Sequence, residues 1–244
     1  IINLMQDASD VNATDINSSF ENDGSTYIVE SVSALNGDAM RVADLSSSDK
    51  PEAVWDITDS GYNGSAITDG FRLDLIGINN AVDEGNDEDI NLRFSNPGVT
   101  VTSQSKAMTT ISFEADGSIK AGYNDGGNMT STTAKEVDAS QFSVKLFMNN
   151  DTNVAMNYTF DSAQHTLDAN NYDIWIDGVK EGTFLMADSA AASNYDPSAG
   201  IANMGFFGSS DSAMGMDFSF DDVTLYTGSD SGLTAVPEPS TYAM

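Results

Sequence analysis

Short runs in which apolar and polar residues alternate make up most of the chain, and clusters of Gly, Asn, Asp and Ser separate them. In one run, Phe71, Leu73 and Leu75 alternate with Arg72 and Asp74. Because successive side chains of a strand point to opposite faces, this period of two predicts a strand with one buried and one wet face. The same pattern predicts further strands at residues 26–33, 39–45, 91–95, 99–104, 111–115, 119–123, 141–148, 172–176, 179–184, 201–207 and 214–226.

Two Asp-Gly dipeptides stand between neighbouring predicted strands, at Asp116-Gly117 and at Asp177-Gly178. These residue types readily adopt the positive φ values of a two-residue hairpin turn. Only residues 185–192 lean towards a helix. About a dozen antiparallel strands and few helices predict an all-β sandwich.

The domain organisation follows from where this pattern stops. We find no internal repeat of the kind that marks solenoids or propellers. Residues 1–226 are therefore expected to form one sandwich domain, and residues 227–244 a linker and an extended C-terminal tail. The linker at 227–235 is rich in Gly, Ser, Asp and Thr and lacks an apolar period, so we expect it to be flexible.

The last predicted strand changes phase. Phe218 and Phe220 share one face, whereas Val223 falls on the opposite parity. One extra residue, at Asp221 or Asp222, would return the apolar residues to a common face, which is what a β-bulge supplies. The sequence therefore predicts a bulge that redirects a carboxylate.

Charge narrows the range of partners. The chain has 38 acidic and 9 basic residues, for a formal net charge of −29, and it has no cysteine. Binding to nucleic acid or to an anionic membrane surface is electrostatically opposed. No stretch approaches the roughly 18 apolar residues that span a bilayer, so no membrane insertion is expected in this form.

Four stretches resemble jelly-roll domains. Residues 172–179 are similar to the strand, Asp-Gly, strand hairpin of laminin-G-like and concanavalin-like sandwiches, and residues 218–225 to the closing strand of carbohydrate-binding modules. Residues 19–24 and 37–42 resemble the opening strands of such domains. The resemblance implies a jelly-roll β-sandwich of about a dozen antiparallel strands.

The same resemblance implies a structural Ca²⁺, held by a final-strand Asp together with oxygens from the opening strands. The candidate ligands are Asp222, Asp221, Glu21 and Asp23. Calcium takes six to eight oxygens, and backbone carbonyls can complete such a shell. The alternative is that both final-strand carboxylates are solvated or bind the amide of the bulge.

The C-terminal residues resemble a sorting signal. They match the Val-Pro-Glu-Pro-Ser-Thr box of the PEP-CTERM family, at Val236, Pro237, Glu238, Pro239, Ser240 and Thr241. This resemblance implies processing by exosortase and a place outside the cell, or on the surface, of a bacterium with an outer membrane. The apolar helix and basic cluster of that family do not follow before Met244, so either the tail has been removed or the sequence is a piece of a longer chain. The start at Ile1, without Met, fits a cleaved secretory signal, with a start inside a longer protein as the alternative.

Recognisable catalytic motifs are scarce. The one histidine, His165, has no nucleophile motif beside it, and a loop or edge position is expected for it. Glu114-Ala115-Asp116 begins the carboxylate pattern of jelly-roll glycanases but runs into the predicted turn. From these residues we expect that the chain is not an enzyme.

Two functions remain. The first is a secreted structural protein that assembles with copies of itself into a filament or matrix through contacts of sandwiches and terminal strands. The alternative is a carbohydrate-binding module whose partner is an extracellular polysaccharide. Its candidate stacking platforms are Trp55, Tyr62, Trp175 and Tyr195.

Overall fold

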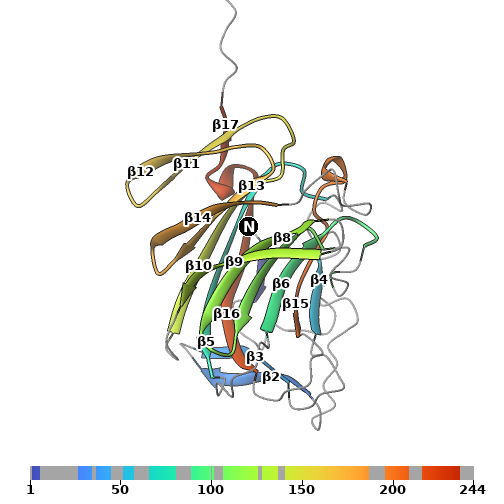
Figure 1. The fold of residues 1–244 in the computed structure, drawn as a ribbon, viewed down its shortest axis with the longest axis vertical. Coiled ribbons are helices and arrows are strands. Elements are labelled where there is room, and N and C mark those ends of the chain that lie inside the picture. The colour runs from blue at the N-terminus through green and yellow to red at the C-terminus, as the bar shows by residue number, and fades with distance from the viewer. Residues whose placement is uncertain are drawn as a thin grey trace, which may run out of the picture.

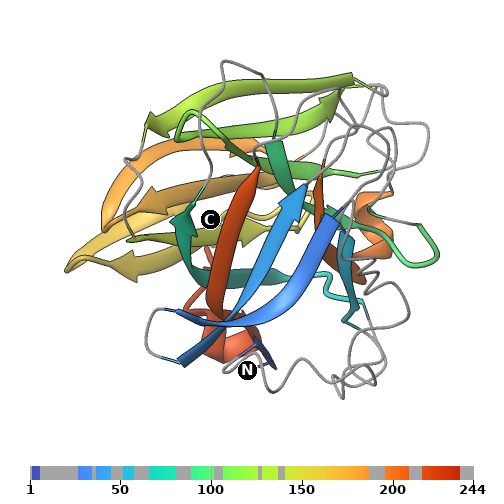
Figure 2. The ribbon, with the colours of Figure 1, turned by 90° about the horizontal axis from the view of Figure 1, so that it is seen from below.

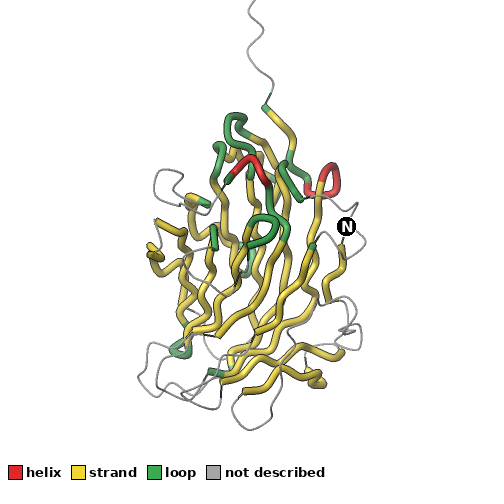
Figure 3. Tube along the Cα trace, turned by 90° about the vertical axis from the view of Figure 1, so that its right-hand side faces the viewer, coloured by secondary structure: helices red, strands yellow, loops and turns green. Residues whose placement is uncertain are grey.

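The structure is a computed structural model that describes residues 2–5, 27–34, 37–44, 52–57, 66–80, 89–99, 101, 107–125, 128–136, 141–186, 196–208 and 216–236. Strands dominate this part of the chain (Figure 3). Its helical elements are two short 3-10 turns, η3 (Pro197–Ala199) and η4 (Gly228–Ser231). Neither is long or apolar enough to cross a membrane.

Two antiparallel sheets form the body of the molecule (Figure 1). The larger runs in the order β14 (Val179–Leu185), β13 (Asn171–Ile176), β10 (Gln141–Asn149), β5 (Gly70–Asn79), β16 (Asp217–Thr227), β3 (Gly37–Asp44) and β2 (Tyr27–Ala34), with β1 (Ile2–Met5) also paired to β16. Figure 2 shows the blue strands β2 and β3 beside the red β16. The smaller sheet runs β4 (Glu52–Asp56), β15 (Asn203–Gly208), β6 (Asp89–Ser95), β7 (Thr109–Glu114), β8 (Ser118–Asp125) and β9 (Asn128–Glu136).

The core lies between the inner faces of these two sheets. Phe113 of β7 is at its centre, with its ring centroid between 5.1 and 6.5 Å from those of Phe142, Phe206, Phe218 and Phe220. These rings come from strands of both sheets, and all are buried. Burying one such side chain contributes roughly 1.5–3 kcal/mol to the free energy of unfolding, so this aromatic cluster is a main source of the packing energy between the two sheets. The predicted all-β sandwich is confirmed.

A third, three-stranded sheet covers part of the outer face of the larger one. Its order is β12 (Ala163–Leu167), β11 (Met156–Phe160) and β17 (Thr234–Ala235), and it lies at one end of the sandwich (Figure 1). Tyr158 stacks on Phe147 of β10, with ring centroids 3.9 Å apart and planes at 12°. These rings form a second buried cluster with Met156, Leu167, Trp175 and Leu233.

The structure orders most of the predicted linker. Leu233 is buried in the second cluster, and β17 pairs with β11. The N–H of Val236 donates to the carbonyl oxygen of Ala155 at 2.8 Å. These contacts depend on one apolar side chain and the two residues of β17, which leave no periodic pattern in the sequence, and the flexibility of the segment stays a prediction.

The predicted bulge in β16 is confirmed. Register against β5 shifts between Asp221, opposite Ile76, and Thr224, opposite Asp74, so β16 carries one extra residue. Asp222 takes a left-handed backbone with φ 52°. The bulge thereby keeps the apolar residues on both sides of it in the core.

Other strands differ from the prediction for local reasons. The edge strands β9 and β12 were missed because they carry few apolar residues to give a period, and β12 is largely exposed. Within the predicted strand at 99–104, Val99 and Val101 lie in a loop and a turn. The turns at Gly117 (φ 91°) and at Asp177-Gly178 (φ 51° and 78°) have the expected positive φ values.

The left-handed backbone of Asp222 leads us to predict how substitutions at this position change stability. A β-branched residue pays the full steric cost of positive φ, whereas glycine does not. We expect Asp222→Val to lower the free energy of unfolding by about 1–2 kcal/mol relative to Asp222→Gly in urea denaturation. Equal stability of the two variants would contradict the bulge.

Candidate functional site

The outer face of the larger sheet carries a groove of about 440 Å³ where β5, β10 and β16 run side by side. Alternate residues of these strands point away from the core, and the groove combines their polar side chains with apolar ones. Its lining residues are Asp74, Leu75, Ile76, Ser143, Val144, Lys145, Asp222, Thr224 and Tyr226.

A shared carboxylate organises the charges in and beside the groove. Asp74 Oδ1 lies 3.0 Å from Arg72 Nε, and Asp74 Oδ2 accepts a hydrogen bond of 2.5 Å from Lys145 Nζ. The guanidinium of Arg72 also lies over the ring of Tyr226, with its central carbon 3.9 Å from the ring centroid. The ring of Tyr226 is thus held in place from one side, and both cations have a counter-ion.

The bulge brings Asp222 to this groove. Its backbone N–H donates to Asp221 Oδ1 at 2.7 Å, and its own side chain is exposed. Asp221, by contrast, is buried. Of the two carboxylates that the sequence placed at the bulge, Asp222 is therefore the one that a ligand in the groove can reach.

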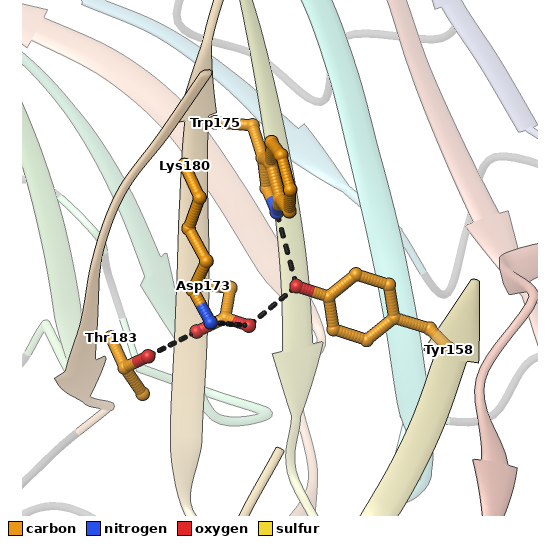
Figure 4. Close-up of polar contacts among 5 residues, drawn as sticks. All are labelled: Tyr158, Asp173, Trp175, Lys180 and Thr183. Carbon is orange, nitrogen blue, oxygen red and sulfur yellow. Dashed lines mark hydrogen bonds and ion pairs between the residues drawn. The ribbon is translucent and has the colours of Figure 1, made fainter. Parts of the chain in front are cut away.

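Beside the groove, a buried carboxylate fixes the third sheet to the larger one (Figure 4). Asp173 is fully buried, and its two oxygens accept hydrogen bonds from Tyr158 Oη at 2.5 Å, Thr183 Oγ1 at 2.5 Å and Lys180 Nζ at 2.7 Å. Trp175 Nε1 donates to Tyr158 Oη at 3.0 Å. Burial, followed by the bond to Asp173, raises the pKa of Tyr158 far above its usual range, so its hydroxyl stays a donor.

His165 packs against the aromatic side chains of the same region. It lies on the edge strand β12, with its ring centroid 5.0 Å from those of both Tyr158 and Trp175. The expected edge position is what the structure has. The half-buried ring serves as packing between two aromatic side chains.

A second polar cluster lies on the smaller sheet. Glu114 is directly opposite Asp89 in the strand register and is 6% exposed, and Lys120 Nζ lies 3.2 Å from its Oε1. Burial, then the charge of Asp89, raises the pKa of Glu114 to about 7, against the effect of Lys120. This cluster has paired carboxylates, but it lies on the smaller sheet, apart from the groove on the larger one.

The sequence candidates divide into three groups. Asp222 lines the groove, whereas Trp55 is 1% exposed in the main core and Trp175 is 6% exposed in the second cluster, so neither indole ring can stack on a sugar. Both tryptophans fill apolar layers that the strand pattern alone could not assign to one face. Outside the described residues lie Glu21, Asp23, Tyr62, Tyr195, Pro237, Glu238, Pro239, Ser240 and Thr241.

The calcium hypothesis stays a prediction. Within the part of the chain that the structure describes, no group of three or more His, Cys, Asp or Glu side chains is arranged to hold a metal ion. Asp221 and Asp222 diverge at the bulge, with one buried and one exposed. The two proposed partners from the opening strands, Glu21 and Asp23, lie outside the described residues.

Sequence reasoning missed the groove residues Lys145, Thr224 and Tyr226. The wet face of β5 was visible as Arg72 and Asp74 alternating with apolar residues. The strand order β10-β5-β16 could not be predicted from the sequence. This order places the solvent-facing sides of three separate strands next to one another.

Solved structures share this fold, although no family model and no curated protein matches the sequence. A carbohydrate esterase from Shiga toxin-encoding bacteriophage phi24B is 13% identical with a TM-score of 0.52, over 84% of this chain and 88% of that one. An alginate lyase from Pseudomonas aeruginosa is 11% identical with a TM-score of 0.50, over 86% and 88%. The carbohydrate recognition domain of Emp47p is 10% identical with a TM-score of 0.49, over 88% and 93%.

At such identities the likeness shows the fold alone, and it confirms the jelly-roll architecture. It also corrects one expectation. The prediction that the chain is not an enzyme is overturned, because proteins named as a carbohydrate esterase and an alginate lyase have this fold. The lack of a familiar linear motif was a poor ground, since catalytic residues on a sandwich come from several strands and need not be close in sequence.

The ion pair between the buried Asp173 and Lys180 should contribute to the free energy of unfolding. Removing its ammonium partner with Lys180→Met leaves a fully buried carboxylate without its cation, and we expect a loss of about 2 kcal/mol in the free energy of unfolding, discounted for the partly exposed lysine. Lys135→Met is the control, because its ion pairs of 3.6 Å are more exposed and should contribute less than about 1 kcal/mol. Equal losses in denaturant titration would contradict the role of Asp173.

Glu114 predicts a pH dependence. Its carboxyl is harder to ionise in the folded state than in the unfolded state, so the stability that it contributes is present at acidic pH and is lost as pH rises through about 7. From about pH 5 to about pH 8, the wild type should lose about 2 kcal/mol more than Glu114→Gln. Parallel stability curves for the two proteins would contradict the raised pKa.

Proposed function

We propose that the protein recognises an extracellular polysaccharide in the groove over β5, β10 and β16. The observation that carries this proposal is the groove itself, an open hollow in which the ring of Tyr226, held on one side by Arg72, lies among hydroxyl, ammonium and carboxylate groups. Sugar rings present both apolar faces and hydroxyl groups, and a site with an aromatic platform and few placed polar groups meets both needs.

The geometry of the groove adds to this. Ser143, Lys145 and Thr224 supply donors along its length, and Asp222 supplies an acceptor. The outer faces of three strands make an open trough, and the jelly-roll neighbours include proteins named for action on carbohydrates, which supports the choice of ligand. Recognition is the step that a lectin and a carbohydrate-active enzyme have in common, and the proposal concerns that step.

We further propose that this recognition takes place outside the cell. The support is the Val236–Thr241 box and its resemblance to the PEP-CTERM signal. The residues before that box pair with β11, and the N–H of Val236 donates to Ala155. Self-assembly into a filament or matrix stays a prediction, and carbohydrate recognition is the better supported of the two functions.

A binding panel tests the groove. Affinity electrophoresis in gels that contain single soluble polysaccharides should retard the wild type with at least one polymer, and Tyr226→Ala should weaken that retardation by about tenfold through loss of the platform. Tyr226→Phe keeps the ring and should bind nearly as the wild type does. Tyr123→Ala, at a half-buried tyrosine of β8 in the other sheet, is the matched control.

Two results would count against the proposal. One is a wild type that no polymer in the panel retards. The other is equal retardation of Tyr226→Ala and Tyr123→Ala, which would place binding elsewhere on the molecule.

A further inference from the structure

A carboxylate of the chain itself partly neutralises the positive charge in and beside the groove. Both cations in and beside it, Arg72 and Lys145, contact the two oxygens of the same carboxylate, Asp74, at 3.0 and 2.5 Å. Arg72 is also stacked over Tyr226. An anionic ligand that approached either cation would also meet the carboxylate of Asp74, so the three side chains together offer it a net charge of only +1.

Asp222 is the charge in the groove that has no counter-ion. Within the described part of the chain its carboxylate makes no hydrogen bond and no ion pair, and only its backbone N–H is engaged, with Asp221. The left-handed bulge at φ 52° sets the position of this side chain independently of the alternation of β16. Asp222 is therefore an exposed, charged acceptor in the groove.

We propose that the groove selects uncharged polysaccharides and rejects polyanionic ones, with Asp222 as the specificity-determining residue. This inference rests on the proposed function. A carboxylate accepts hydrogen bonds from sugar hydroxyls, whereas it repels a uronate or sulfate group at the same distance. The formal net charge of −29 acts in the same direction at low salt.

The proposed ligand class differs from that of a solved structure with the same fold. One of the solved structures with this fold is an alginate lyase, and alginate is a polyanion. In the present chain, the cations that could receive a uronate carboxylate already bind Asp74. The fold does not carry the ligand class with it, because the outer-face side chains decide it.

Isothermal titration with two sets of polymers tests the inference. The uncharged set is soluble β-glucan, galactomannan and xyloglucan, and the polyanionic set is alginate, polygalacturonate and dextran sulfate, each at about 20 mM and about 500 mM NaCl. We expect the wild type to bind at least one uncharged polymer with a Kd that changes less than about twofold with salt. Alginate should bind at least about tenfold more weakly at low salt.

The variants Asp222→Asn and Asp168→Asn sharpen the test. Both remove one negative charge from an exposed position, but Asp168 follows β12 outside the groove, so the pair is matched in net charge. Asparagine tolerates the left-handed backbone at 222. We expect Asp222→Asn to bind polyanions about three- to tenfold more tightly at low salt, with the gain reduced at high salt, and Asp168→Asn to bind as the wild type does.

The outcomes separate the two claims. Tight binding of alginate by the wild type, or an equal gain in both variants, overturns the selection by Asp222 and leaves carbohydrate recognition in place. A wild type that binds neither set overturns the proposed function and the inference with it.

Discussion

The structure depends on the requirement that β16 present apolar side chains to one core along its whole length. Phe218 and Phe220 fill that core before the bulge, and Val223 and Leu225 fill it after the bulge, although their sequence parity differs. One inserted residue reconciles the two halves, because the period of a strand is two and any odd displacement would turn the second half outwards. The same insertion moves Asp222 out of the regular alternation and into the groove. Packing inside the sandwich therefore sets the chemistry on its surface.

The outer face of the larger sheet is divided by what covers it. Where the three-stranded sheet lies, buried aromatic side chains cover the face, and the buried carboxylate of Asp173 is surrounded by donors from Tyr158, Thr183 and Lys180 (Figure 4). Where that sheet ends, the face carries the groove, which is lined by both polar and apolar side chains. The strand β17 adds Thr234 and Ala235 to this cover by pairing with β11.

The sandwich and the bulge could be predicted from the sequence, because both follow from the need to bury apolar side chains on one face of each strand. It also indicates the wet face of β5, since Arg72 and Asp74 interrupt an apolar run. It could not indicate the groove, because β10, β5 and β16 are far apart in the chain and only tertiary pairing makes them neighbours. The tryptophans misled for a related reason: an aromatic residue in a strand is equally suited to a core and to a sugar platform, and burial decides between them. The edge strand β9 could not be predicted from the sequence because it has few apolar residues and they form no period of two.

Hydrogen exchange measured with and without a bound uncharged polysaccharide tests the location of the ligand most directly. The account predicts slower exchange in the presence of the polymer at residues 72–76, 143–145 and 222–226, which come from three separate strands that meet only in the groove. It predicts unchanged exchange at residues 89–95 and 109–114 of the opposite sheet. Protection confined to the opposite sheet, or to the β11–β12 hairpin, would contradict the account.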